Sequence, residues 1–309
     1  MKKITVVGAG RVGESTAQFI ASRDLCREIA LIDMREGAAE GVALDIQQNA
    51  PIFSFDTRLK GGSSPELMAD SDLIIVTAGI PRKPGMSRSD VMETNVQVID
   101  EIVDNALKLA PNAMMLVVSN PVDILTYRAW KRTGWDRRRV LGQAGVLDST
   151  RMASFIALET GFSALDIDAM VMGGHGDSMV PMMRFTTISG IPVSNFLDQS
   201  CLDNIVTRTR NGGAEILALR QNSSAYAAPA AAVAVMVDAI VHDRKRILPS
   251  VAILENEYGY NDIAIGVPCV LGKNGMEEVI ELELTKPELE NFTNSAIMVQ
   301  KDLETLAKL

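Results

Sequence analysis

Short, almost wholly apolar runs recur through the first half of the chain, and stretches of helical periodicity separate them. The apolar runs cover residues 4–10, 28–34, 72–79, 113–120 and 139–145. Aliphatic and β-branched residues fill such runs when helices cover both faces of a parallel sheet. The helical patterns between them lie at residues 12–24, 41–50, 95–110 and 124–134. This alternation predicts an α/β fold whose parallel sheet is doubly wound, with right-handed crossovers.

The regular alternation of apolar runs and helical patterns ends after about residue 146. Strand-like stretches at 167–174 and 179–193 now mix with helical ones instead of alternating regularly with them. The change predicts two domains, a doubly wound parallel sheet in residues 1–146 and a mixed α+β domain in residues 147–309.

Helical patterns dominate the end of the chain. Residues 202–245 have helical spacing, with a break expected near Gly212-Gly213 and Pro229. A last helix is expected after Thr285, whose hydroxyl suits a helix cap.

Charge and cysteine content narrow the class of protein. The net charge of −9 disfavours nucleic acid and anionic membranes as main partners. The three cysteines match no disulfide framework or metal spacing, which suits a reducing cytosol. The N-terminus lacks the apolar length of a signal peptide, and the alanine-rich stretch 225–241 contains Pro229, which favours a buried helix over a membrane span. We expect a soluble, cytoplasmic protein.

A GxGxxG pattern, formed by Gly8, Gly10 and Gly13, ends the first predicted strand and opens the first predicted helix. In this context Gly8 permits a tight turn, Gly10 lets a pyrophosphate approach the backbone, and Gly13 lets helix pack on strand. The helix N-terminus offers unpaired N–H groups to phosphates. The pattern predicts a dinucleotide-binding Rossmann domain.

An acidic residue supports that interpretation. Asp33 ends the second strand, twenty residues after Gly13, where a carboxylate can accept both ribose hydroxyls and repel a 2′-phosphate. This favours NAD over NADP, although Arg35 leaves some room for the latter. A flavodoxin-like turn with a helix-capping aspartate is the alternative.

A basic loop follows the third apolar run. Residues 80–90 carry Arg82, Lys83 and Arg88 among two prolines and a glycine. Loops at the carboxyl ends of parallel strands lie over the ligand crevice, so three cations here would attract an anion. A solvated surface loop is the alternative.

Three further residues could form an acid–base site. Asp148 and Arg151 share one face of a predicted helix, and His175 lies between glycines. A carboxylate on one nitrogen of an imidazole fixes its tautomer and lets the other nitrogen take a proton. A helix cap with an ion pair, and a turn or core histidine, are the alternatives.

Other catalytic chemistries lack support. Ser178 is near His175, but the GxSxG turn of many hydrolases is missing. The chain contains no HxxH or CxxC, so no metal is expected. The only other histidine, His242, ends a helical run among charged residues, where a solvated or capping role is expected.

The motifs GAGRVG, TAGIPRKPGMSR, VVSNP, GQAGVLDSTR and GGHGDSMVP occur in this order and, with Asp33, span essentially the whole chain. Together they resemble the lactate/malate dehydrogenase family, and within it the malate-type members. The resemblance implies reversible, NAD-dependent oxidation of (S)-malate to oxaloacetate, a step of the tricarboxylic acid cycle.

The resemblance also implies roles for individual residues. His175 matches the catalytic acid–base and Asp148 its carboxylate partner. Arg151 matches the arginine that grips the substrate C1 carboxylate, and Arg88 the one that polarises the C2 oxygen. Further substrate contacts match Asn120 and Ser224. The cofactor contacts match Gly8, Ala9, Gly10, Arg11, Val12, Gly13, Asp33, Asn95, Val118, Ser119 and Asn120.

Arg82 decides between substrates in this family. Lactate-specific members usually have glutamine there, whereas a four-carbon diacid brings a second carboxylate that needs a cation. An unpaired buried charge costs roughly 3–5 kcal/mol, or a few hundredfold or more in selectivity. The resemblance therefore implies a small dicarboxylate substrate. It also implies a homo-oligomer, with a tetramer favoured over a dimer. The alternatives are an L-lactate or other 2-hydroxyacid dehydrogenase and, from a different class, a non-catalytic NAD-binding protein.

Overall fold

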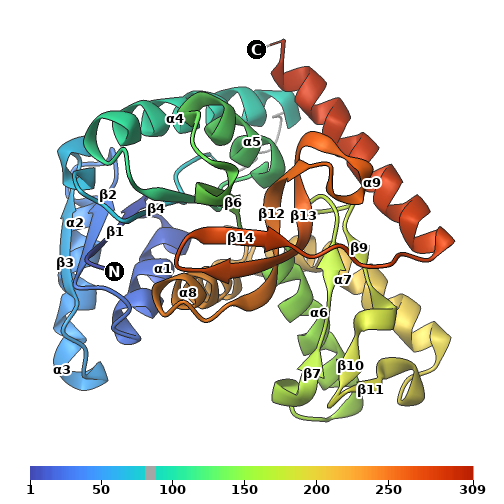
Figure 1. The fold of residues 1–309 in the computed structure, drawn as a ribbon. Helices are drawn as coiled ribbons and strands as arrows, with labels where there is room; N and C mark the ends of the chain where they lie inside the picture. Colours follow the sequence, from blue (N-terminus) through green and yellow to red (C-terminus); the bar gives the residue numbers. More distant parts are fainter. Residues whose placement is uncertain (81–87, 309) are drawn as a thin grey trace.

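The computed structural model describes residues 1–80 and 88–308, with the backbone alone at 88–90 (Figure 1). Its helices are α1 (Arg11–Ser22), α2 (Ala38–Gln48), α3 (Ala50–Phe53), α4 (Arg88–Leu109), α5 (Val122–Thr133), α6 (Gly145–Thr160), α7 (Gln199–Arg220), α8 (Ala227–Val241) and α9 (Lys286–Leu306). Short 3-10 helices are η1 (Pro65–Met68), η2 (Arg137–Arg139), η3 (Ala164–Asp166), η4 (Met183–Phe185), η5 (Val193–Asn195) and η6 (Glu257–Gly259).

A nine-stranded sheet forms the centre of the molecule, in the order β14-β13-β12-β6-β5-β4-β1-β2-β3. Its parallel part consists of β1 (Lys3–Val7), β2 (Glu28–Ile32), β3 (Arg58–Gly62), β4 (Leu73–Val76), β5 (Met114–Val117) and β6 (Val140–Gly142). Five of these six strands are the five predicted from apolar runs, so the doubly wound α/β fold is confirmed. The sixth, β3, has the sequence RLKGG and lies at the edge of the sheet, where Arg58 and Lys60 are exposed.

Three strands from the end of the chain extend the same sheet. They are β12 (Arg246–Glu255), β13 (Asn261–Gly272) and β14 (Gly275–Val279), and each pairs antiparallel with its neighbour. The junction with the parallel part is a single residue pair, Val251 opposite Gly142. These strands were not predicted from the sequence, and they make the sheet continuous across residue 146.

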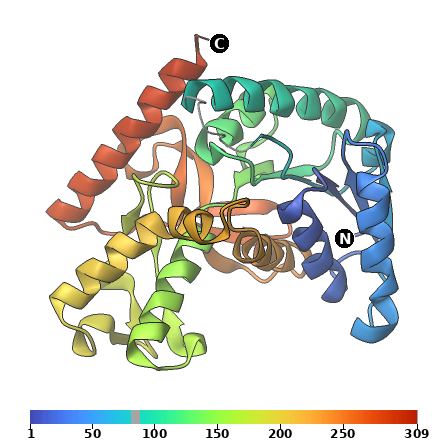
Figure 2. The same ribbon diagram turned by 180° about the vertical axis from the view of Figure 1, so that it is seen from behind.

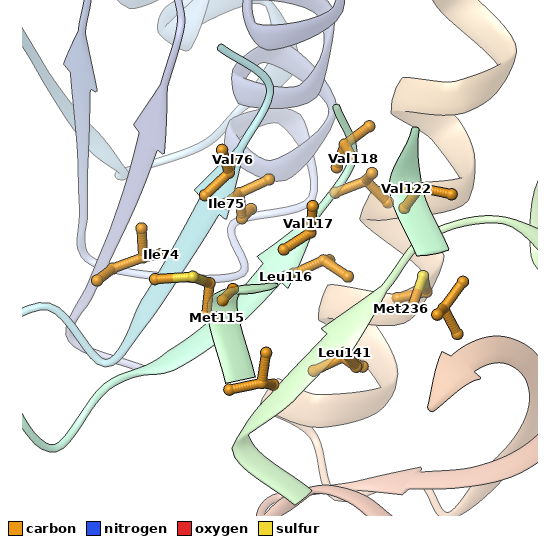
Figure 3. Close-up of a cluster of buried hydrophobic side chains, with 14 of the residues drawn as sticks. Ile74, Ile75, Val76, Met115, Leu116, Val117, Val118, Val122, Leu141 and Met236 are labelled. Atoms are coloured by element: carbon orange, nitrogen blue, oxygen red, sulfur yellow. The ribbon is translucent and has the colours of Figure 1, made fainter. Parts of the chain in front are cut away.

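Helices cover both faces of the sheet. One face carries α4 and α5, and the other carries α1 and α8, which pack together (Figures 1 and 2). Figure 3 shows the core between them, in which aliphatic side chains of β4, β5 and β6 meet Val122 of α5 and Met236 of α8. Both faces of β4 are fully buried, which explains its unbroken apolar sequence.

The mixed region beyond α6 carries two small antiparallel sheets. One pairs β7 (Ile167–Asp168), β10 (Thr187–Ile188) and β11 (Ile191–Pro192), and the other pairs β8 (Val171–Met172) with β9 (Val180–Pro181). These short strands agree with the predicted strand character of both stretches.

The expected helix break near Gly212-Gly213 is wrong. Helix α7 runs unbroken through both glycines, and the chain breaks instead between α7 and α8, where Gln221 has a φ of 62°. A Cβ on Gly212 would lie 2.4 Å from Cδ of Arg151, so this glycine permits close packing of α7 on α6. Pro229 lies in the first turn of α8, where its missing N–H is not needed.

The remaining helix expectations agree with the structure. Helix α8 is largely buried, and the side chains of Thr285 and Glu288 form a capping box at the start of α9. None of the helices in the described part of the chain is long and apolar enough to cross a membrane.

Candidate active site

The turn after β1 is built by its glycines. Gly8 has a φ of 102°, and a Cβ there would lie 2.7 Å from the backbone nitrogen of Ala78. A Cβ on Gly13 would lie 1.8 Å from the carbonyl oxygen of Gly8, so α1 can approach β1 only with glycine at this position. Around Gly10, in contrast, a Cβ would meet no described atom within 4 Å. The turn is therefore closed beneath α1 and open beside its first residue, as a phosphate-binding turn requires.

The carboxylate of Asp33 lies beside this turn. Its Oδ2 accepts a hydrogen bond of 2.9 Å from the backbone N–H of Ala9. Arg35 forms a two-pronged ion pair with both oxygens at 3.0 Å, although its own side chain is 65% exposed. These Arg35 hydrogen bonds are the main reason that the pKa of Asp33 lies below its ordinary value, with the Ala9 bond adding to them. Asp33 is thus charged and held close to Ala9.

Arg11 and Val12 begin α1. The Arg11 guanidinium is exposed and lies 5.6 Å from the centre of the Tyr226 ring, just before α8. Val12 is half-buried against the core. Arg11 therefore connects the first turn of α1 to the segment between α7 and α8, which contains the exposed Ser224.

Two predicted cofactor residues, Asn95 of α4 and Ser119 after β5, stabilise neighbouring loops. The Asn95 side chain is 2% exposed; its Nδ2 donates to the carbonyl of Asn120 at 2.7 Å, and its Oδ1 accepts from the N–H of Ile80 at 2.8 Å. The Ser119 hydroxyl donates to the carbonyl of Ala78 at 2.6 Å, beside the buried Val118. Asn120, which precedes a cis peptide bond to Pro121, is exposed. Asn95 therefore connects the segment at Ile80 to the loop at Asn120, a structural role that its sequence position does not predict.

His175, Asp148 and Arg151 come together from two elements. Nδ1 of His175 lies 2.9 Å from Oδ2 of Asp148, which is 1% exposed, in the first turn of α6. Nη1 of Arg151, one turn further along α6, donates to Oδ1 of Asp148 at 3.2 Å. The carboxylate therefore bridges the imidazole and the guanidinium. Because Nδ1 faces a carboxylate, it carries the proton in neutral His175, and Nε2 is the basic nitrogen.

Two opposing effects act on the pKa of His175. Burial of the ring by itself would lower this pKa, since it disfavours the charged form. The carboxylates of Asp148 and Asp123 outweigh burial and raise the pKa above its ordinary value, with Arg151 acting against them. The two carboxylates thus favour the protonated imidazole, the form in which a general acid donates its proton.

The loop around His175 is held by two residues that were not predicted as part of the site, Asp123 and Ser295. The backbone N–H of His175 donates to Oδ2 of Asp123 at 2.9 Å, and that of Gly174 donates to the Ser295 hydroxyl at 2.8 Å. Asp123 follows the VVSNP motif at the carboxyl edge of the sheet, which is a position that favours ligand-site residues. That placement is the pattern from which Asp123 could be found, whereas nothing near Ser295 in sequence points to it.

Some candidate residues lie beyond what the structure describes. Arg82 and Lys83 lie outside the described residues. Arg88 begins α4, and its side chain is outside them as well. His242 is the C-cap of α8, half-exposed and 3.7 Å from Asp238, which agrees with its expected capping role. Among the described side chains, no three histidine, cysteine or acidic groups are arranged to hold a metal ion.

Two family models together cover nearly the whole chain. Residues 2–142 match the NAD binding domain of lactate/malate dehydrogenases, and residues 145–309 match their alpha/beta C-terminal domain.

Individual relatives agree with these matches. The chain is 65% identical over 306 residues to a malate dehydrogenase of Thioalkalivibrio sulfidiphilus, covering 99% of this chain and 100% of the relative. It is 42% identical to the solved malate dehydrogenase of Salinibacter ruber, with a TM-score of 0.95 and coverage of 99% and 98%. A lactate dehydrogenase of Cryptosporidium parvum, complexed with lactic acid and nicotinamide adenine dinucleotide, is 35% identical, with a TM-score of 0.96 and coverage of 100% and 98%. The fold alone thus does not separate the two activities.

Proposed function

The chain belongs to the lactate/malate dehydrogenase family, and from that membership we propose that it is an NAD-dependent malate dehydrogenase, which interconverts (S)-malate and oxaloacetate. The observation that carries the proposal is the 2.9 Å contact between Nδ1 of His175 and the buried carboxylate of Asp148. This pair turns an imidazole into a base whose orientation and tautomer are fixed.

The residues of the first domain fit a dinucleotide. Open space beside Gly10 leaves room for a pyrophosphate, and the first N–H groups of α1 are unpaired by the helix itself. The charged Asp33 carboxylate is an acceptor for ribose hydroxyls. Bound NAD would supply the hydride acceptor, and Gly8 to Gly13, Asp33, Asn95 and residues 118–120 would hold it.

The chain's own residues then perform the proton chemistry. In malate oxidation, Nε2 of His175 takes the proton of the C2 hydroxyl, while Nδ1 keeps its hydrogen bond to Asp148. The resulting imidazolium is stabilised by the Asp148 carboxylate, which does not itself take up the proton. In oxaloacetate reduction, the protonated His175 returns a proton to the same oxygen.

Arginines position the substrate. We assign to Arg151 the C1 carboxylate, because its forked guanidinium suits a planar carboxylate and is already fixed by Asp148. Arg88 would stabilise the developing charge on the C2 oxygen, and Asn120 and Ser224 would complete the substrate contacts. Arg82 would pair with the second carboxylate of a four-carbon diacid, which favours malate over lactate.

A substrate comparison tests this proposal. Purified protein should oxidise NADH with oxaloacetate at least a few hundredfold more efficiently, in kcat/KM, than with pyruvate. Arg82→Gln should reduce this ratio strongly, because the second carboxylate loses its cation. Arg58→Gln on the edge strand β3 is the matched control for loss of one positive charge. A preference for pyruvate in the unaltered protein would favour the lactate alternative. An unchanged ratio in Arg82→Gln would remove that residue from substrate selection.

We also propose a cytoplasmic homo-oligomer, a tetramer rather than a dimer, acting in the tricarboxylic acid cycle. Large apolar side chains are exposed on the single chain near α2 and α3, where Leu44 is 63% and Ile52 78% exposed. Contact with another copy would remove such surface from water. Light scattering of the purified protein measures the mass directly, and a single-chain mass would refute the assembly.

A further inference from the structure

A second buried carboxylate lies next to the His175–Asp148 pair. Asp123 is in the first turn of α5 and is 7% exposed. Its Oδ2 accepts the 2.9 Å hydrogen bond from the backbone N–H of His175. Its Oδ1 is buried and has no hydrogen-bond partner among the described residues. Buried acceptors without a partner are uncommon in folded proteins, so this carboxylate requires a specific explanation.

Support of the loop backbone explains only part of why a carboxylate is buried at position 123. Three successive residues of the loop are held by three different elements: Gly173 bonds with Gly266 of β13, Gly174 with Ser295 of α9, and His175 with Asp123. At Gly174 the neutral hydroxyl of Ser295 is a sufficient acceptor. An asparagine oxygen at position 123 could accept the same bond from His175. The hydrogen bond therefore requires an oxygen there, but not a negative charge.

The charge of Asp123 acts on its surroundings. Burial raises the pKa of Asp123 to about 6, although the His175 N–H bond and the charge of His175 oppose the rise. Asp123 in turn helps to raise the pKa of His175. The charged groups that act on His175 from the described elements packed around it are Asp148 and Arg151 of α6 and Asp123 of α5. Arg151 favours the neutral imidazole, whereas the two carboxylates favour the imidazolium.

We propose that Asp123 is a positioning residue of the acid–base site, which fixes the backbone of His175 and stabilises its imidazolium form with a second negative charge. The contribution to catalysis rests on the proposed dehydrogenase function, since the imidazolium is the form that donates a proton to oxaloacetate. The effect on His175 itself does not depend on that function.

The chain contains only two histidines, which makes the effect measurable. We would label histidine with ¹³C and ¹⁵N, follow the imidazole resonances by NMR against pH, and assign them with His242→Asn. In Asp123→Asn, which keeps an acceptor oxygen but loses the charge, the pKa of His175 should fall below that of the unaltered protein. Asp45→Asn, which removes an exposed carboxylate on α2 at the other end of the sheet, should leave it unchanged. Ser295→Ala, which removes a neighbouring backbone clamp without a charge, should also leave it unchanged.

Kinetics provide the second measurement. Oxaloacetate reduction requires protonated His175, so kcat/KM falls as pH rises through the His175 pKa. Asp123→Asn should move this fall to lower pH and reduce kcat/KM about tenfold at pH 8, in line with the weaker proton affinity of the imidazole.

Two outcomes are decisive. A folded Asp123→Asn protein whose His175 titrates as in the unaltered protein would overturn the electrostatic part of the proposal. Asp123→Ser, a smaller neutral acceptor, provides the same comparison if the asparagine variant does not fold. An unaltered protein that titrates as expected but does not reduce oxaloacetate would refute the proposed function, while the NMR result would still decide the role of Asp123.

Discussion

The glycine-rich turn after β1 and the glycine-rich loop around His175 use similar residues in different ways. The turn is formed by consecutive residues of one strand–turn–helix unit, and its aspartate, Asp33, is paired with the exposed Arg35. The His175 loop is held by α5, α6, β13 and α9, and its aspartates, Asp148 and Asp123, are almost fully buried. The space available for a side chain restricts which residues the turn can contain. In the loop, the restriction comes from buried charges, whose interactions are strong in a low-dielectric interior.

This difference predicts how each region responds to change. In the loop, single polar substitutions should alter chemistry and leave cofactor binding intact. In the turn, added volume should alter cofactor binding and stability, while exposed charges should matter little.

The largest effect is expected for His175→Asn. Loss of the proton acceptor should reduce kcat by about 10²–10⁴-fold, the usual contribution of a general acid–base. NADH binding, measured by fluorescence titration, should remain within about twofold, because His175 is not part of the turn after β1. His242→Asn is the matched control, since His242 caps α8 through its backbone and its half-exposed side chain lies 3.7 Å from Asp238. Retained turnover in His175→Asn would exclude this residue as the acid–base.

The next largest effect is expected for Gly13→Ala, which is to be compared with Gly10→Ala in the same turn. Gly13→Ala places a Cβ against the carbonyl oxygen of Gly8, so α1 must shift away from β1. We expect a loss of about 1–3 kcal/mol in the free energy of unfolding, measured with urea, and weaker NADH binding.

Gly10→Ala separates the two properties. The open space around Gly10 should leave stability within about 0.5 kcal/mol, whereas the added methyl group should weaken NADH binding where the pyrophosphate approaches. Equal losses of stability in both variants would contradict a turn that is closed at one glycine and open at the other.

Arg35→Ala should have the smallest effect. The Arg35–Asp33 pair is largely exposed on the arginine side, so its loss should change the free energy of unfolding very little. Without Arg35 the pKa of Asp33 should rise toward its ordinary value, and the uncompensated carboxylate should repel a 2′-phosphate more strongly. The ratio of NADPH to NADH use, in kcat/KM, should therefore fall. A rise in this ratio would show that Arg35 does not support NADP.

Buried strands and short-range motifs were the predictable parts of this molecule. The strands β1, β2, β4, β5 and β6 are mostly apolar because helices cover both faces, with charged residues only at the first positions of β1 and β2. β3 is an edge strand with charged residues, so its sequence lacks that pattern. The strands β12 to β14 pair with their neighbours in sequence, but β12 joins the parallel part of the sheet only through Val251 opposite Gly142, more than a hundred positions away. No local pattern encodes that contact.

The site likewise contains features that are encoded locally and features that depend on long-range contacts. The turn glycines and Asp33 were recognisable from spacing within one unit of structure. That His175 lies against Asp148 depends on how the loop between β8 and β9 packs on α6. The bond from His175 to Asp123 spans 52 residues, and the Gly174–Ser295 bond spans 121. The family resemblance implies the His175–Asp148 pair, whereas the bonds to Asp123 and Ser295 are revealed only by the folded chain.

The continuous sheet has a consequence for attempts to divide the protein. A fragment that ended near residue 146 would expose the edge of β6, which otherwise faces β12, and the surface of α1 on which α8 packs. Open strand edges and bare apolar faces promote aggregation. Exchange of the cofactor-binding half between relatives would therefore have to carry β12 and α8 with it. Recombination points should be sought in surface loops, such as the turn between β13 and β14, and not at the junction of the two halves.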